Sequence, residues 1–114
     1  MQQRIYRLQA ELCKTLSHPT RLAIIDHCKD GEKSVTELLE LIGVGKANLS
    51  QHLALLRQKH ITVTRREGAN VYHRIAHWKI ITVCNIIREI LTEQLVEYGK
   101  MHQYIDGLHT QREE

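Results

Sequence analysis

Two stretches of the chain, residues 3–16 and 77–98, repeat apolar residues at three- and four-residue steps. This spacing places the apolar side chains on one face of a helix, so each stretch predicts an amphipathic helix. The second stripe is broad and carries few charges, and such a face must be buried against something. Residues 99–114 have a weaker pattern, which predicts either an extension of that helix or a frayed tail. The first stripe contains Ile5, Leu8, Leu12 and Leu16, and the second contains Ile80, Val83, Cys84, Ile87, Ile90, Leu91 and Leu95.

A shorter helix is predicted over residues 19–29. Ser17 or His18 can cap its start, and Pro19 suits its first turn, where a missing N–H group costs nothing. Gly31 is expected to end this helix in the left-handed conformation. The residues expected to face inward are Leu22, Ile24, Ile25 and Cys28.

Residues 35–58 are typical of a helix-turn-helix. Ser34 and Glu37 have the spacing of a capping box, in which each side chain accepts a hydrogen bond from the other residue's backbone N–H. The short helix that follows closes at Gly43, and a second helix is predicted over residues 46–58. Two helices joined by a short turn that contains glycine form the helix-turn-helix pattern. The second helix is expected to bury Leu49, Leu53 and Leu56.

Residues 61–75 alternate β-branched and polar side chains around Gly68 and Ala69, which predicts a β-hairpin with its turn at residues 67–70. A hairpin directly after a helix-turn-helix is a wing. The expected fold is therefore a single domain, mainly α with a small β-hairpin, in which four helices precede the hairpin and one follows it. The apolar faces of the first and last helices predict that they pack together and against a second subunit.

Charge is unevenly distributed along the 114 residues, whose formal net charge is +3. Residues 44–79 hold seven lysines and arginines and one acid, Glu67, whereas the rest of the chain is mildly acidic. A local positive field of this kind suits a polyanionic partner. The three cysteines are widely spaced, which argues against a disulfide scaffold and a structural zinc site. Because no stretch resembles a membrane span or a signal peptide, we expect a cytoplasmic protein.

The helix of residues 46–58 gathers polar side chains on the face opposite its leucines. Asparagine and glutamine amides read adenine edges in the major groove, whereas serine and arginine suit phosphates or the minor groove. We therefore expect double-stranded DNA as the partner. The predicted contacts are Lys46, Asn48, Ser50, Gln51, His52 and Arg57 in the helix-turn-helix, and Arg65, Arg66, Asn70 and Arg74 in the wing.

Four segments, LSHPTRL, SVTEL, NLSQHLALLR and TRREGANVYHRI, closely resemble the ArsR family of arsenical and metal repressors. The resemblance covers about residues 11–91. It implies a homodimer that is joined through the first and last helices, binds a palindromic operator near its own promoter and is released by an inducer. It also implies a wing from Arg65 to Arg74, and Gly45 stands where many members carry a capping serine. The recognition positions that it implies are Lys46, Ala47, Asn48, Ser50, Gln51 and His52.

The resemblance does not identify the inducer. Members that sense arsenic or cadmium carry a Cys-x-Cys box where this chain has residues 37–41, and members that sense zinc or nickel carry ligands on the last helix that are absent here. A sulfur-responsive subgroup uses one cysteine in the second helix and one in the last. Cys28 and Cys84 occupy the same two helices in a different register, and Cys13 lies in the first helix.

Several alternatives stay open at this stage. The cysteines are either small buried hydrophobes, a thiol or persulfide switch, or ligands of trivalent arsenic or another soft ion. The inducer is accordingly sulfane sulfur, an oxidant or a metal ion at a non-classical site. A different class of function is a helical interaction module that does not bind DNA. Since no catalytic grouping or phosphate-binding loop is visible, we expect neither an enzyme nor a cofactor.

Overall fold

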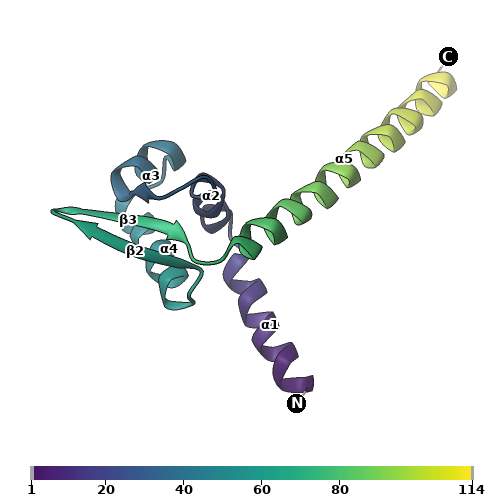
Figure 1. Cartoon of the computed structure of the whole chain (residues 1–114). Helices are drawn as coiled ribbons and strands as arrows, with labels where there is room; N and C mark the ends of the chain where they lie inside the picture. Colours follow the sequence, from purple (N-terminus) through teal and green to yellow (C-terminus); the bar gives the residue numbers. More distant parts are fainter. Residues whose placement is uncertain (1, 114) are drawn as a thin grey trace. The chain divides into compact units, whose positions relative to one another are not determined.

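The computed structural model describes the backbone of residues 2–113 and the side chains of residues 2–103, 106 and 107. The chain divides into two compact units, Met1–Ile81 and Thr82–Glu114. Within the described residues, no helix is both long enough and apolar enough to cross a membrane. Along the chain the elements are α1 (Gln2–Leu16), α2 (Pro19–His27), β1 (Lys33–Ser34), α3 (Val35–Ile42), α4 (Lys46–Gln58), β2 (Thr62–Glu67), β3 (Asn70–Ile75) and α5 (Trp78–Glu113) (Figure 1).

The start of α2 settles which residue caps it. The Nδ1 atom of His18 accepts a hydrogen bond from the backbone N–H of Thr20 at 3.0 Å. The hydroxyl of Ser17 instead donates to the carbonyl of Lys14, at the end of α1. His18 is therefore the N-cap of α2, and Pro19 occupies the first turn as predicted.

The end of α2 differs from the prediction in two respects. The helix stops at His27 with Cys28 as its C-cap, and Gly31 lies beyond it with a φ of 151°, outside the left-handed helical region. The reason is that the chain tightens into a turn, in which the N–H of Gly31 donates to the carbonyl of Cys28. Leu22, which was expected to face inward, is exposed because the core is reached by its neighbours Ile24 and Ile25.

The capping box of α3 is confirmed. The Ser34 hydroxyl accepts from the Glu37 N–H at 3.1 Å, and the Glu37 carboxylate accepts from the Ser34 N–H at 3.2 Å. Gly43 ends this helix with a φ of 75°, a left-handed conformation that glycine adopts without steric cost. The chain then needs only a short turn before α4 begins at Lys46.

The core of the first unit lies between α2, α3, α4 and the start of the sheet. Leu49, Leu53 and Leu56 are buried as predicted, so one face of α4 is fixed inward. Their partners come from elements distant in sequence, which makes the helix-turn-helix and the sheet one packed body. The other buried apolar side chains are Leu16, Ile24, Ile25, Cys28, Leu38 and Ile61.

The sheet has three antiparallel strands in the order β1-β3-β2, one more than the predicted hairpin. The hairpin itself is confirmed: residue pairs run from Thr62 with Ile75 to Glu67 with Asn70, and the turn contains Gly68 with a φ of 61°. Its tip projects from the body of the unit (Figure 1). The third strand is only two residues long and pairs with β3, so it has no periodic pattern that sequence analysis could detect. The fold is a mainly helical winged helix-turn-helix.

The last helix, α5, runs without a break to Glu113. Of the two outcomes left open for residues 99–114, the described part continues the helix, and residue 114 lies outside the description. Most of the apolar stripe predicted for α5 is exposed to solvent in the single chain: Val83, Ile87, Ile90, Leu91 and Leu95 are exposed, whereas Ile80 and Cys84 are half-buried. Further exposed apolar side chains on this helix, outside the predicted stripe, are Ile86, Val96, Tyr98 and Met101.

Candidate nucleic-acid interface

The N-terminal half of α4 presents a polar surface to solvent. Gly45 is its N-cap and supplies no side-chain hydrogen bond, so the first turn relies on the Leu49 N–H donating to the Gly45 carbonyl at 2.9 Å. Because the three buried leucines fix one face inward, the intervening positions must point outward. The predicted DNA contacts that are exposed on this helix are Lys46, Ala47, Asn48, Ser50, Gln51 and Arg57.

His52 is the predicted DNA contact on α4 that is not exposed. The sequence placed it with the outward polar residues, but the structure leaves it half-buried on the side that faces α2. Its Nδ1 atom lies 3.0 Å from a guanidinium nitrogen of Arg21, and its ring lies 4.2 Å from that of His18. Partial burial lowers the pKa of His52, and the nearby His18 and Arg21 lower it further. The missed factor was the long-range contact with Arg21.

Arg65 of the wing is also engaged within the protein. Its guanidinium donates two hydrogen bonds to Glu32, at 3.1 and 2.6 Å, and a third to Glu67 at 2.7 Å. It also lies over the ring of Tyr72, 4.6 Å from the centroid. These hydrogen bonds raise the pKa of Arg65, and the bond to Arg65 lowers the pKa of the Glu32 carboxyl. No local motif distinguishes Glu32, because its pairing with Arg65 depends on how the loop before β1 meets the wing.

The other wing residues differ in which face of the hairpin they occupy. In the β2–β3 register, Arg74 pairs with Val63 and shares a face with Arg65, whereas Arg66 pairs with Val71 on the opposite face. Arg74 also lowers the pKa of Glu32, so the two charges lie close together. Arg66, Asn70 and Arg74 are exposed and hold no ion pair among the described residues.

The three cysteines occupy different environments. Cys28 is 2% exposed, and burial raises its pKa to about 11. It lines a shallow hollow of the first unit together with residues that include Lys29, Arg74 and Trp78. Cys84, in the second unit, is half-buried with a raised pKa for the same reason, and Cys13 is exposed. Among the described side chains, no group of three or more histidine, cysteine or acidic residues could hold a metal ion.

Comparison with known proteins identifies the family. A helix-turn-helix domain model matches residues 16–60. The chain is 40% identical over 85 residues to a biofilm growth-associated repressor of Xylella fastidiosa, covering 75% of each protein. It is 36% identical over 92 residues to the HTH-type transcriptional regulator Rv0081 of Mycobacterium tuberculosis, covering 80% of this chain and 81% of that protein.

Solved structures agree with this relationship. The crystal structure of Rv0081 superposes with a TM-score of 0.75 at 35% identity, covering 82% of this chain and 94% of that one. The solution structure of a homodimeric winged helix-turn-helix domain, Mb0332 of Mycobacterium bovis, described as a possible ArsR-family regulator, gives a TM-score of 0.72 at 26% identity. That match covers 81% of this chain and 85% of that one. The chain belongs to the ArsR family of winged helix-turn-helix transcriptional regulators.

Proposed function

We propose that this chain is a homodimeric repressor that inserts α4 into the major groove of operator DNA and lays its wing beside the backbone. The observation that carries the proposal is the exposed polar surface at the N-terminal half of α4, the end that enters the groove in helix-turn-helix proteins. The Xylella relative is named as a repressor, and membership of a family of transcriptional regulators argues against an enzyme.

The described geometry supports a division of labour among the exposed residues. Asn48 and Gln51 carry amides that can bond adenine in two places, a contact worth about 1–3 kcal/mol of base discrimination. Ser50, Lys46 and Arg57 suit phosphates, which fix the register without reading sequence. In the wing, Arg66 and Arg74 are the cations available to DNA, since Arg65 is held by Glu32 and Glu67.

A dimer is supported by the apolar faces that the single chain leaves exposed. Ile5, Leu8 and Leu12 form such a face on α1, with exposures of 55%, 52% and 39%. The second unit carries another along α5, and apolar faces of this size favour burial against a partner. A homodimer would place two recognition helices about one DNA turn apart, roughly 34 Å, as a palindromic operator requires. The Mycobacterium bovis relative is homodimeric.

The test is a fluorescence-anisotropy titration with the DNA upstream of the chain's own coding sequence and with a scrambled duplex. We expect Gln51→Ala to weaken operator binding selectively by about 10-fold or more, consistent with the loss of one bidentate base contact per subunit. Arg66→Ala should weaken binding to both duplexes and reduce the salt dependence. Gln58→Ala is the matched control, because Gln58 is an exposed glutamine at the far end of the same helix.

Two outcomes would overturn this proposal. If the wild-type dimer does not bind either duplex even at low salt, the chain acts as an interaction module rather than as a repressor. If Gln51→Ala binds the operator as tightly as Gln58→Ala does, the reading surface lies elsewhere on the unit.

For the inducer, we propose that Cys28 serves the core in the DNA-binding state and reacts only when the end of α2 opens. The thiolate is the reactive form of cysteine. With a pKa of about 11, only roughly one Cys28 in ten thousand is ionised near pH 7. A sulfur or oxidant switch therefore needs either that opening or an initial reaction at Cys13 or Cys84.

Alkylation kinetics test this assignment. In the DNA-bound protein, a maleimide should label Cys13 rapidly and Cys28 only at the rate of local opening, as judged by mass spectrometry. If the maleimide labels Cys28 as rapidly as Cys13 in the DNA-bound protein, the core does not protect Cys28 and this assignment is wrong. If polysulfide releases Cys13→Ser, Cys28→Ser and Cys84→Ser as readily as the wild-type protein, no single cysteine is the sensor.

A further inference from the structure

We propose that Arg21 is a positioning residue that ties the end of α1 to the recognition helix through His52, so that α1 and α4 move as one body. This inference rests on the proposed DNA-reading role of α4. We call the group formed by Arg21, His52 and the carbonyls of Lys14 and Thr15 the Arg21 clamp. Sequence motifs gave no reason to connect these residues, which come from three different helices.

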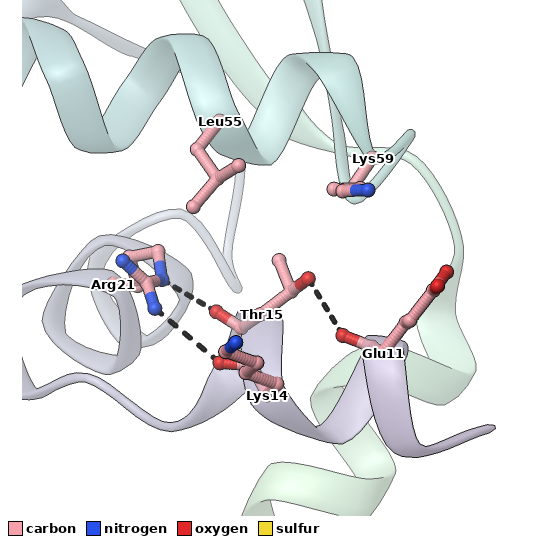
Figure 2. A pocket seen from close by; sticks show the side chains of 6 residues that line it. All are labelled: Glu11, Lys14, Thr15, Arg21, Leu55 and Lys59. Atoms are coloured by element: carbon pink, nitrogen blue, oxygen red, sulfur yellow. Dashed lines mark hydrogen bonds between the residues drawn. The ribbon is translucent and has the colours of Figure 1, made fainter. Parts of the chain in front are cut away.

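The geometry of the clamp uses three of the guanidinium nitrogens. The Nε atom of Arg21 donates to the carbonyl of Thr15 at 2.5 Å, and Nη2 donates to the carbonyl of Lys14 at 3.3 Å. Figure 2 shows the guanidinium reaching from α2 to these two carbonyls at the end of α1. The last carbonyls of a helix have no partner within the helix, so Arg21 acts as a cap for α1. Its third nitrogen, Nη1, lies 3.0 Å from Nδ1 of His52 on α4.

The chemistry of the pair fixes the state of His52. Arginine has donors and no acceptor, so Nδ1 of His52 must accept and the proton of the neutral ring must sit on Nε2. The ring of His18 lies against that of His52, and its own Nδ1 already accepts from the Thr20 N–H. The clamp therefore joins the α1 terminus, the N-cap of α2 and the recognition helix in one continuous set of contacts.

This arrangement connects the two surfaces that the proposed function requires. α1 carries the exposed apolar face, and Thr15 and Leu16 at its end are buried. α4 carries the polar reading surface. A planar guanidinium that bonds three acceptors at once restrains the angle between these helices, which a flexible lysine could not do. A shift of α1 within the dimer would therefore be passed to α4.

The clamp predicts a specific effect of pH. Protonating Nδ1 of His52 would remove the acceptor and place a cation next to Arg21, so the clamp requires the neutral ring. The charged or titratable groups that face His52 are His18 at the α1–α2 junction and Arg21 on α2. Glu11, Lys14 and Lys59 line the adjoining hollow, with Arg21 at one side (Figure 2). If His52 instead bound a DNA phosphate, its protonation would strengthen DNA binding as the pH falls. If His52 belongs to the clamp, its protonation breaks the bond to Arg21 and weakens DNA binding.

The experiment compares the operator affinity of the wild-type protein and four variants at about pH 8 and about pH 5.5, with melting temperature measured in parallel. His52→Asn is the matched control, because an asparagine can offer an oxygen to Arg21 near the position of Nδ1 but cannot take up a proton. His52→Ala and Arg21→Met remove the two sides of the bond. The double variant closes a mutant cycle.

At the higher pH we expect His52→Asn to bind within about twofold of wild type, and His52→Ala and Arg21→Met to bind about fivefold or more weakly. The double variant should be no weaker than the weaker single variant, because each single variant already loses the bond between Arg21 and His52. On lowering the pH, wild-type affinity should fall relative to His52→Asn. Nitrogen NMR of the imidazole should show Nδ1 unprotonated at the higher pH and Arg21→Met should shift that resonance.

The clamp is overturned if the two single variants act additively, or if wild-type affinity rises relative to His52→Asn as the pH falls. It is also overturned if Arg21→Met changes the melting temperature and leaves the DNA affinity of the folded protein unchanged. These outcomes are distinct from failure of the proposed function, in which the wild-type protein itself would not bind the operator or Gln51→Ala would have no effect.

Discussion

Replacing Glu32 with glutamine would loosen Arg65, which among the described residues is the wing arginine that forms ion pairs. The Glu32 carboxylate accepts two hydrogen bonds from Arg65 at 3.1 and 2.6 Å, and it lies near Arg74. Glutamine keeps the size of the side chain but loses the charge and one acceptor. Arg65 would then be retained only by Glu67 and Tyr72, and a DNA phosphate could compete for it.

The size of the effect follows from counterion release. Each phosphate contact contributes about 0.9 to the exponent with which affinity falls as salt rises, so one freed arginine in each of two subunits adds about 1.8. The gain in affinity of Glu32→Gln over wild type should therefore depend on salt. A fourfold change in salt raised to the power of about 1.8 is about 12, so the gain should be about 12-fold larger at about 50 mM than at about 200 mM salt. Glu32→Gln should therefore bind DNA more tightly than wild type, with a steeper salt dependence.

The assay is the same anisotropy titration, repeated at the two salt concentrations. Glu40→Gln on α3 is the control, because it removes one carboxylate charge from an exposed position outside the wing. If the two variants gain equally, the effect reflects net charge and Arg65 is not freed. If Glu32→Gln binds more weakly than wild type, the reasoning is refuted, because Glu32 then orients Arg65 toward DNA instead of withholding it.

Three further predictions concern stability and can be checked by urea unfolding. Ser34→Ala removes one half of the capping box and should lower the free energy of unfolding by about 1 kcal/mol, with no change in the denaturant slope. Leu56→Ala empties a site that is 0% exposed in the core behind α4 and should cost about 2–5 kcal/mol, whereas Ala54→Gly on the exposed face should cost about 1 kcal/mol. His73 is buried, and this burial lowers its pKa, with a smaller contribution from the charge of Arg57. The unfolded chain therefore binds a proton at this histidine more readily than the folded protein does. The free energy of unfolding should accordingly fall as the pH drops below about 6.5. A His73→Gln variant should lose part of this pH dependence, and an unchanged profile would contradict the assignment.

Much of the fold could be predicted because its signals lie within a few residues of one another. The capping box joins Ser34 and Glu37, and the buried stripe of α4 repeats within two turns. The hairpin turn even determines that Arg65 stands opposite Tyr72, since a two-residue turn at Gly68 fixes every pair above it. Between residues only a few positions apart in the sequence, hydrogen bonding and side-chain direction depend on the local backbone alone.

Most of the errors arose where two distant segments meet, whereas the early end of α2 reflects a local turn between Cys28 and Gly31. Leu22 lies on a predicted apolar face of α2 but is exposed, because the neighbouring helices cover Ile24 and Ile25 instead. Gly31 was expected to end α2, but the chain had already turned at Cys28. The short strand β1 exists only because β3 offers it hydrogen bonds.

Local patterns are enough to specify the helix-turn-helix, the hairpin and the set of polar residues that α4 and the wing could present. How the elements pack decides which of these residues have a partner within the protein. His52 is engaged by Arg21, 31 positions earlier, and Arg65 by Glu32, 33 positions earlier. Periodicity specifies only which way a side chain points from its own element. Its hydrogen-bond partner depends on the packing of whole elements against each other, which no local pattern encodes.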